Sequence, residues 1–283
     1  MSVLFPGESD SLHVRLFSVG YIELGEWWTH ADHIRTMWRL CRADDEGASL
    51  ICDSRRFPLA AGRFVLVPPG LAFEARLERP VKRLHIHFEV LGWTAAMVRE
   101  LFVEPVVLPR DEFRDRLAAV VRDELGSSDH LDSALSCRAK SLVHLTLAEL
   151  EKVLPDEDAA ILRRVVDGQE ELLSVLRFID RHLEEPLSNT RLAEVAHASE
   201  SCFIRRFREV IGQTPGRYVQ ERRVTEASKL LVSTDRSIEE IAERCGFANR
   251  YYFSRVFTQH MGRPPARYRH ERPFARRAEA RNG

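Results

Sequence analysis

The chain has 283 residues, of which 44% are hydrophobic and 30% are charged, and its formal net charge is −1. This length fits about two domains of roughly 100–200 residues and is sufficient for real hydrophobic cores. No run of about 18 apolar residues occurs, which excludes a membrane-spanning helix. The five cysteines are scattered and lack CxxC spacing, which indicates neither a disulfide framework nor a zinc site. The opening MSVLFPGESD has no secretory pattern, so we expect a cytoplasmic protein.

The first predicted elements are short strands within residues 12–90. The segments 12–24, 34–41, 62–70 and 81–90 mix apolar, β-branched and aromatic residues between Gly and Pro turns, which favours a small barrel or sandwich. Alternation along the last segment places Val81, Arg83, His85, His87 and Glu89 on one face and Lys82, Leu84, Ile86, Phe88 and Val90 on the other.

Helical spacing begins after Gly92. Residues 94–102, 111–125 and 131–154 are predicted helices, and the last is apolar around much of its girth. We expect such a helix to be buried on more than one side, against its own barrel, a partner subunit, or both. Residues 155–169 open with Pro and an acidic cluster and are predicted to be an interdomain linker, partly helical.

The remainder is predicted to be helical throughout. Residues 216–233 form one long amphipathic helix of roughly 27 Å. Ser237 to Glu240 is a capping box that opens the next helix, and Asn249 is a suitable N-cap for the last long one. Ser188 or Asn189 is the expected cap of an earlier helix.

Residues 170–283 contain 21 basic and 16 acidic side chains, a net of +5, whereas residues 1–169 contain 21 and 27, a net of −6. This asymmetry favours a polyanion-binding module joined to a different domain.

An internal duplication is the most informative pattern in this basic half. The residues that recur 50 positions on are Phe203, Arg205, Phe207, Gly212, Pro215, Arg217 and Tyr218, which reappear as Phe253, Arg255, Phe257, Gly262, Pro265, Arg267 and Tyr268. Leu192-Ala193 reappears 49 positions on as Ile241-Ala242. Each copy is predicted to be a helix, a short turn and a second helix, the geometry that places a helix in a DNA major groove.

These residues resemble the DNA-binding domain of AraC/XylS-type transcriptional regulators. The resemblance covers about residues 170–270, and its most diagnostic part is IAERCGF followed by YYFSRVF, Gly262-x-x-Pro265 and Tyr268-Arg269. It implies two helix-turn-helix subdomains joined by the long helix at 216–233, with one recognition helix each for successive major-groove turns.

By position, the resemblance implies a set of base-reading residues, which are Ser201, Ile204, Arg205, Arg250, Tyr251, Ser254 and Arg255. The spacing of 201, 204 and 205 independently places them on one helix face. Arginine pairs bidentately with guanine, so Arg205 and Arg255 are the expected base readers. The expected phosphate contacts are Arg206, Arg208, Arg217 and Arg267.

The N-terminal half resembles a cupin barrel more loosely, through Gly62-RFVLV-Pro68-Pro69-Gly70-LA-Phe73. Phe73 stands where the metal-binding His of that motif belongs, so we expect no metal and no cofactor. The residues chosen as a candidate effector pocket are Trp28, Trp38, Phe73, His85 and His87. A metal site built on His85, His87 and Glu89, with His30 and His33 upstream, is the alternative interpretation.

The sequence therefore predicts an α+β multidomain protein. Its expected parts are a cupin-like ligand-sensing barrel (1–92), a helical dimerisation segment (93–154), a linker (155–169), an AraC-type DNA-binding domain (170–270) and a basic tail (271–283). The expected function is a sequence-specific transcriptional regulator, an effector-responsive activator and not an enzyme, with double-stranded DNA, a small-molecule effector, RNA polymerase and a second copy of itself as partners. The rival hypotheses are a metal-dependent cupin enzyme with an appended helical domain and a constitutive DNA-binding protein with a purely structural barrel.

Overall fold

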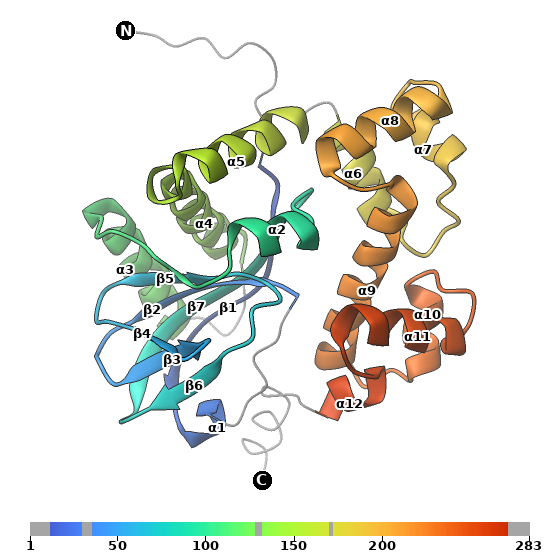
Figure 1. The fold of residues 1–283 in the computed structure, drawn as a ribbon. Coiled ribbons are helices and arrows are strands. Elements are labelled where there is room, and N and C mark those ends of the chain that lie inside the picture. The colour runs from blue at the N-terminus through green and yellow to red at the C-terminus, as the bar shows by residue number, and fades with distance from the viewer. Residues whose placement is uncertain (1–11, 30–35, 128–131, 170–171, 271–283) are drawn as a thin grey trace, which may run out of the picture. The chain divides into compact units, whose positions relative to one another are not determined.

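The computed structural model describes residues 12–29, 36–127, 132–169 and 172–270, and these form two units, 1–167 and 168–283 (Figure 1). The first unit is rich in strands and the second is helical. His30, His33 and the predicted basic tail at 271–283 lie outside the described residues. Within the described ranges, no helix is both long and apolar enough to cross a membrane.

The first unit contains two separate antiparallel sheets, so the prediction of one closed barrel is wrong. One sheet has the order β1 (Val14–Leu24), β7 (Val81–Val90), β2 (Trp38–Ala43), β5 (Phe64–Val67) and β8 (Val106–Val107). The other has the order β4 (Arg55–Pro58), β3 (Ala48–Cys52) and β6 (Glu74–Leu77). The sequence patterns predicted β1, β2, β5 and β7 but missed the three strands of the smaller sheet. Those strands are short, and unlike β5 they are not continuous runs of large apolar residues.

The larger sheet is buried on both faces. One face carries Leu84, Ile86 and Phe88 into a core shared with the helices, and the other contributes Val65 and Val67 to a core shared with the smaller sheet. A four-residue helix, α1 (Glu26–Thr29), follows β1. Trp28 enters the core between the sheets, where it is 3% exposed, and Trp27 packs partly buried against it.

Four helices complete the first unit: α2 (Ala95–Leu101), α3 (Glu112–Ser127), α4 (Ser133–Val153) and α5 (Asp156–Gln169). Most apolar residues of α4 are buried in its own chain, with Leu142 and Leu150 at 0% exposure, whereas Leu145 is half-buried and Val153 is 37% exposed. The apolar residues around α4 therefore do not require a partner subunit to cover them. Residues 156–169, expected to be a partly helical linker, are helical throughout, and Leu162 joins the core of the first unit.

The second unit consists of α6 (Leu173–Arg181), α7 (Asn189–Val195), α8 (Glu200–Ile211), α9 (Pro215–Ser233), α10 (Ile238–Arg244), α11 (Arg250–Met261) and α12 (Pro265–His270). The predicted caps are confirmed. Ser188 Oγ accepts from Arg191 N, Asn249 Oδ1 accepts from Tyr252 N, and Ser237 and Glu240 form the full capping box. The N–H of Ser237 donates to the Glu240 carboxylate, and this bond lowers the pKa of that carboxyl.

The duplication seen in the sequence is repeated in the packing. In the first copy, Phe203 contacts Phe207 edge-on at 5.5 Å between ring centroids, and Phe207 contacts Tyr218 at 5.6 Å. In the second copy, the corresponding distances for Phe253, Phe257 and Tyr268 are 5.5 and 5.3 Å. Both α8 and α11 end at a left-handed glycine, Gly212 and Gly262. Each copy therefore builds the same aromatic core beneath its second helix.

The turns between the paired helices differ in one residue. Gly246 in the second copy has φ +71°, and the residue 49 positions earlier, His197, has φ +51°. The N–H of each donates to the residue three positions back, at 2.8 and 3.0 Å. A Cβ at position 246 would lie 2.3 Å from the carbonyl oxygen of Leu183, whereas His197 is exposed. Only the second turn is thus restricted to glycine by both backbone conformation and space.

We predict that Gly246→Ala destabilises the second unit by about 2 kcal/mol or more, because it adds left-handed strain to a backbone clash. The matched change His197→Gly removes a side chain from a left-handed position and should alter stability by less than about 1 kcal/mol. All four tryptophans lie in the first unit. Urea unfolding followed by far-UV circular dichroism, with tryptophan fluorescence as a reporter of the first unit alone, separates the two units. Equal effects of both changes would contradict this account.

Candidate functional site

The first predicted recognition helix, α8, separates its polar and apolar faces as the sequence indicated. Ser201 and Arg205 are exposed and Ile204 is half-buried beside them. Phe203 and Phe207 point into the core, with 1% and 0% exposure. The three polar-face positions follow one another at helical spacing, so they present one surface to any ligand of this helix.

The second predicted recognition helix, α11, presents a larger surface. Arg250, Tyr251 and Arg255 are exposed, Ser254 is half-buried, and Tyr251 has 87% of its side chain exposed. The Arg255 guanidinium lies 5.4 Å from the centre of the Tyr252 ring. Stacking of this kind restricts the arginine before it meets a ligand.

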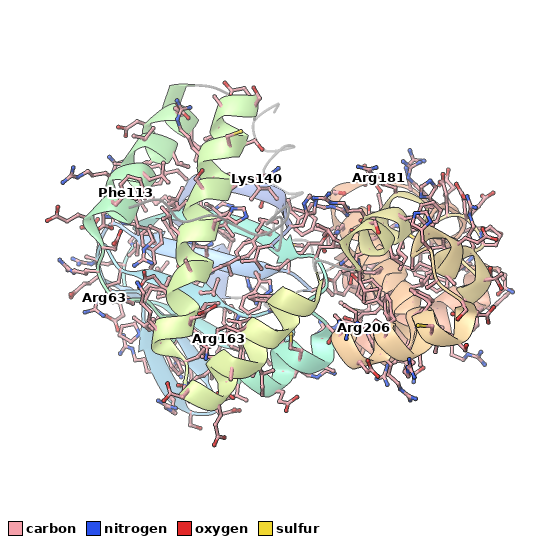
Figure 2. All side chains as sticks on the ribbon, turned by 90° about the horizontal axis from the view of Figure 1, so that it is seen from above. Arg63, Phe113, Lys140, Arg163, Arg181 and Arg206 are labelled. Carbon is pink, nitrogen blue, oxygen red and sulfur yellow. The ribbon has the colours of Figure 1, made fainter. Side chains whose placement is uncertain are left out.

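The four arginines predicted to contact phosphates, Arg206, Arg208, Arg217 and Arg267, are all exposed. Arg206 forms an ion pair with Glu209 at 3.7 Å (Figure 2). Arg217 and Arg267 are duplicates of each other, in the first turn of α9 and in α12. Exposed guanidinium groups near helix starts are suited to anionic ligands.

Two adjacent arginines of α9 fix this helix to the start of the unit. Arg222 is bidentate to Asp180 on α6, with Nε–Oδ1 at 2.8 Å and Nη2–Oδ2 at 3.3 Å, and the two side chains are 9% and 2% exposed. Arg223 donates from Nε to the carbonyl of Leu183 at 2.9 Å and from Nη2 to that of Glu185 at 2.7 Å. A buried bidentate pair is sensitive to geometry, so these contacts define the orientation of α9.

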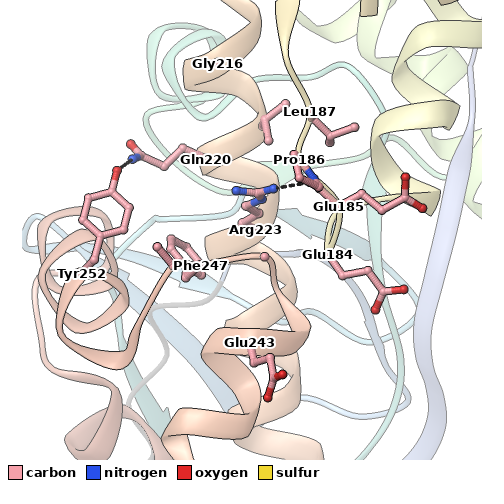
Figure 3. Close-up of a pocket in the computed structure, with 13 residues that line it drawn as sticks. Glu184, Glu185, Pro186, Leu187, Gly216, Gln220, Arg223, Glu243, Phe247 and Tyr252 are labelled. Carbon is pink, nitrogen blue, oxygen red and sulfur yellow. Dashed lines mark hydrogen bonds between the residues drawn. The ribbon is translucent and has the colours of Figure 1, made fainter. Parts of the chain in front are cut away.

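An open cavity of about 550 Å³ lies where α9, the α6–α7 loop and the α10–α11 turn meet (Figure 3). Gln220 Nε2 donates to the Tyr252 hydroxyl at 3.1 Å across it, and Arg223 lies against the loop. The acidic lining residues Glu184, Glu185 and Glu243 make it unsuited to DNA phosphates. We interpret it as the groove between the two helix-turn-helix subdomains, held open by the contacts of α9.

The first unit holds an unusual set of polar residues between its two sheets. Arg39 is 6% exposed, Arg83 7%, His85 3% and Glu89 5%. All four belong to β2 or β7, on the face opposite the helices. The pKa of His85 is lowered to about 3, first by burial and then by the nearby Arg83 charge, so its ring is neutral. Gly20 makes room for this ring, since a Cβ there would lie 2.5 Å from it.

Four of the five candidate effector residues share this interior. Trp28 lies 5.5 Å from the Arg83 guanidinium, Phe73 lies 4.8 Å from that of Arg39, and the rings of His85 and His87 are 4.9 Å apart. The fifth, Trp38, belongs to the other core of the sheet, where it contacts Phe88, Trp93 and Phe102. It is a packing residue against the helices, because successive positions of β2 face opposite sides.

The residues of the alternative metal site have other partners. Ser18 Oγ and His87 Nδ1 are 2.9 Å apart, and Glu89 forms an ion pair with Arg15 at 3.4 Å. Over the described parts of the chain, no three His, Cys, Asp or Glu side chains converge as metal ligands would. The arrangement thus offers no support for a metal-dependent enzyme.

Comparison with known proteins identifies the second unit. A helix-turn-helix domain model matches residues 192–271. The chain is 35% identical over 102 residues to the regulatory protein SoxS of Salmonella typhimurium, and this match covers 36% of the chain and 95% of SoxS. The chain belongs to the AraC/XylS family of transcriptional regulators. It is a DNA-binding regulator of transcription.

Other relatives differ in how much of them is matched. The MmsAB operon regulatory protein of Pseudomonas aeruginosa is 31% identical over 109 residues, which cover 38% of this chain and 36% of that regulator. The crystal structure of ToxT from Vibrio cholerae O395 has a TM-score of 0.50 and 13% identity, and the match covers 90% of this chain and 97% of ToxT. The ToxT likeness is one of fold: a strand-rich first part followed by a helical second part.

Three residues of evident importance escaped the sequence reasoning. Arg222 looked like one of many charges on an amphipathic helix, and only its partner Asp180 shows that it is buried. Arg39 and Arg83 stand within the predicted strand segments 34–41 and 81–90. Alternation along 81–90 places Arg83 on the same face as His85. An arginine on a strand face that is otherwise expected to be buried is the signal that could have identified it.

We predict that burial of neutral His85 makes the first unit sensitive to acid. Its folded pKa of about 3 lies below the ordinary value of about 6.5. The unfolded state therefore binds the extra proton as pH falls from about 6.5 towards 3, and stability is lost over that window. From pH 7 to pH 5 the loss attributable to His85 is about 2 kcal/mol. Urea unfolding followed by tryptophan fluorescence at pH 7, 6 and 5 should show a smaller loss for His85→Gln. Parallel pH profiles would contradict the prediction.

Proposed function

We propose that this regulator reads its operator through α8 and α11, with Ser201, Ile204, Arg205, Arg250, Tyr251, Ser254 and Arg255 as the residues that face the bases. The observation that carries the proposal is the duplicated aromatic core beneath two helices whose outer faces are polar. One frame, α9, carries both helices. Two recognition helices held at a fixed separation suit two successive major-groove segments about 10 base pairs apart.

The first unit then acts as the sensor. We assign ligand sensing to residues 1–92, a cupin-like module in spite of its two separate sheets, dimerisation to 93–154 and DNA binding to 170–270. Effector binding shifts the population of DNA-competent dimers, and the bound dimer activates transcription by recruiting RNA polymerase. The polar interior between the two sheets supports a sensing role, because buried arginines are costly unless an anion or acceptor pairs with them.

The base-reading assignment predicts different outcomes for arginines at different positions. Arg205→Ala and Arg255→Ala should each cost about 1–3 kcal/mol of binding and relax specificity at separate base pairs. Arg208→Ala, the control for a phosphate contact, should weaken binding to all sequences about equally and reduce the salt dependence. Binding-site selection on each variant measures both effects. An unchanged motif, or blurring of the same base pairs by both variants, would refute the assignment.

The surface that we propose for dimerisation lies on α3 and not on α4. Phe113, which Figure 2 labels, and Val120 lie two turns apart on α3 and are 65% and 43% exposed. Large apolar side chains at that spacing form a stripe that a second copy of the chain would cover. Contacts through α3 leave the core positions of α4 undisturbed.

We predict that the double change Phe113→Ser and Val120→Ser weakens dimerisation at least about tenfold, since each side chain loses apolar burial at the contact. Sedimentation equilibrium at micromolar concentration measures the effect, and circular dichroism checks folding. Val103, which is 68% exposed outside α3, provides the control change Val103→Ser. A monomeric wild type, with and without DNA, would exclude the dimer.

A further inference from the structure

Arg83 is a buried cation, and no carboxylate among the described residues pairs with it. Its side chain lies on β7 in the interior between the two sheets and is 7% exposed. Its guanidinium lies 5.5 Å from the centre of the Trp28 ring. Throughout the part of the chain that the structure describes, the Arg83 guanidinium makes neither a hydrogen bond nor an ion pair, and its Nε is fully buried.

The surroundings of Arg83 explain why no partner is available. Its neighbours on the same face are Ile22 and Ala43 across the two adjoining strands and Val81 and His85 along its own. The pKa of His85, lowered to about 3 by burial and by Arg83, keeps that ring neutral. The acidic residue on this strand face is Glu89, six positions and roughly 20 Å farther along the strand, and it is paired with Arg15.

Another buried arginine shows what a structural role looks like in this protein. Arg222, at 8% exposure, has a bidentate carboxylate partner in Asp180. Arg83 is equally buried and has only an aromatic ring. A buried guanidinium without an anion among the described residues is costly, which makes Arg83 a candidate for binding an anion from outside the chain.

We propose that Arg83, stacked on Trp28, binds the carboxylate of a small apolar organic acid, and that this acid is the effector of the regulator. This inference rests on the proposed sensing function of the first unit. Guanidinium and carboxylate match as a planar bidentate pair. The apolar side chains around Arg83, including Ile22 and Ala43, suit a ligand whose remainder is hydrocarbon or aromatic.

The same surroundings disfavour a phosphate. A phosphate dianion requires several donors or cations, whereas Arg83 is the one charged group among its strand neighbours. A single positive charge in an apolar setting neutralises a monocarboxylate and leaves no net charge buried. The chemical class is therefore a monocarboxylate.

The test uses the full-length protein and three variants. Arg83→Met removes the charge but keeps an unbranched side chain, Arg83→Lys keeps the charge without the planar fork, and Arg63→Met is the control at an exposed arginine. Without ligand, we expect Arg83→Met to raise the Tm by a few degrees, about 2 °C or more, because an unpaired buried charge is removed. Arg63→Met should leave the Tm unchanged. A lower Tm for Arg83→Met would mean that the charge stabilises the fold, and would overturn the proposal.

Ligand binding is then measured by thermal shift and calorimetry at pH 7 with hexanoate, 3-phenylpropanoate, their uncharged amides and inorganic phosphate. We expect at least one of the carboxylates to raise the Tm of the wild type and of Arg63→Met. The amides and phosphate should not. Affinity should fall at least about tenfold in Arg83→Lys and be lost in Arg83→Met. The absence of binding by both carboxylates at millimolar concentration, equal binding of the amides, preference for phosphate, or unimpaired binding by Arg83→Met would each overturn the proposal.

DNA affinity, followed by fluorescence anisotropy on a promoter fragment, separates this inference from the proposed function. Carboxylates that bind through Arg83 but leave DNA affinity unchanged would establish the site and reject its role as the sensor. An uncharged compound that changes DNA affinity while both carboxylates fail to bind would keep the sensing function and reject the Arg83 site.

Discussion

The position of α9 is the constraint on which the DNA-binding unit depends. Two consecutive arginines project from this helix about 100° apart, so they reach different parts of the segment before it. Arg222 pairs with Asp180 inside α6, and Arg223 binds the carbonyls of Leu183 and Glu185 just beyond that helix. The second subdomain meets the same segment, since Gly246 packs against the Leu183 carbonyl. Both helix-turn-helix subdomains are therefore positioned by contacts with the same short stretch of chain, from Asp180 to Glu185.

The sequence predicted this unit well because its duplicated residues are those that build each subdomain. Phenylalanines four apart and a tyrosine further along specify one aromatic cluster, and Ser237 and Asn249 specify helix starts by local hydrogen bonds. What it did not predict depends on contacts between the copies. Nothing local distinguishes His197 from Gly246, whose difference arises because the Leu183 carbonyl approaches only the second turn. Likewise, the hydrogen bond that the Tyr252 hydroxyl accepts comes from Gln220, which is 32 positions away in the sequence.

The first unit was harder to predict, for a physical reason. Both faces of the larger sheet are covered, so side chains on either face are buried. Alternation along a strand shows which residues share a face, but it does not show whether that face packs against the helices or against the smaller sheet. The bounds of β7 followed from its alternation. Trp38, chosen as a candidate pocket residue, lies in the core on the other face, because the sequence alone does not show which face of β2 the helices cover. The strands of the smaller sheet are too short for a periodic signal. Residues 155–169 were predicted to be a partly helical linker because their acidic opening obscured the apolar residues Ala159 and Leu162, which are buried.

Buried arginines have different surroundings in the two units. This difference bears on how a ligand could change the stability of the first unit. In the DNA-binding unit each deeply placed guanidinium of α9 has its acceptor within the chain, so this frame does not depend on a ligand. In the first unit Arg83 has no such acceptor among the described residues, and an anion bound to it would stabilise only the folded state. Such a ligand adds RT ln(1 + [L]/Kd) to the stability of that unit, about 2.7 kcal/mol when its concentration is a hundred times Kd. A shift of that size is enough to change the populations of two states by about a hundredfold. The net negative charge of residues 1–169 does not oppose this, because surface carboxylates are screened by solvent whereas the interior guanidinium is not. Under the proposed sensing function, ligand binding at Arg83 would therefore be enough to make the regulator responsive.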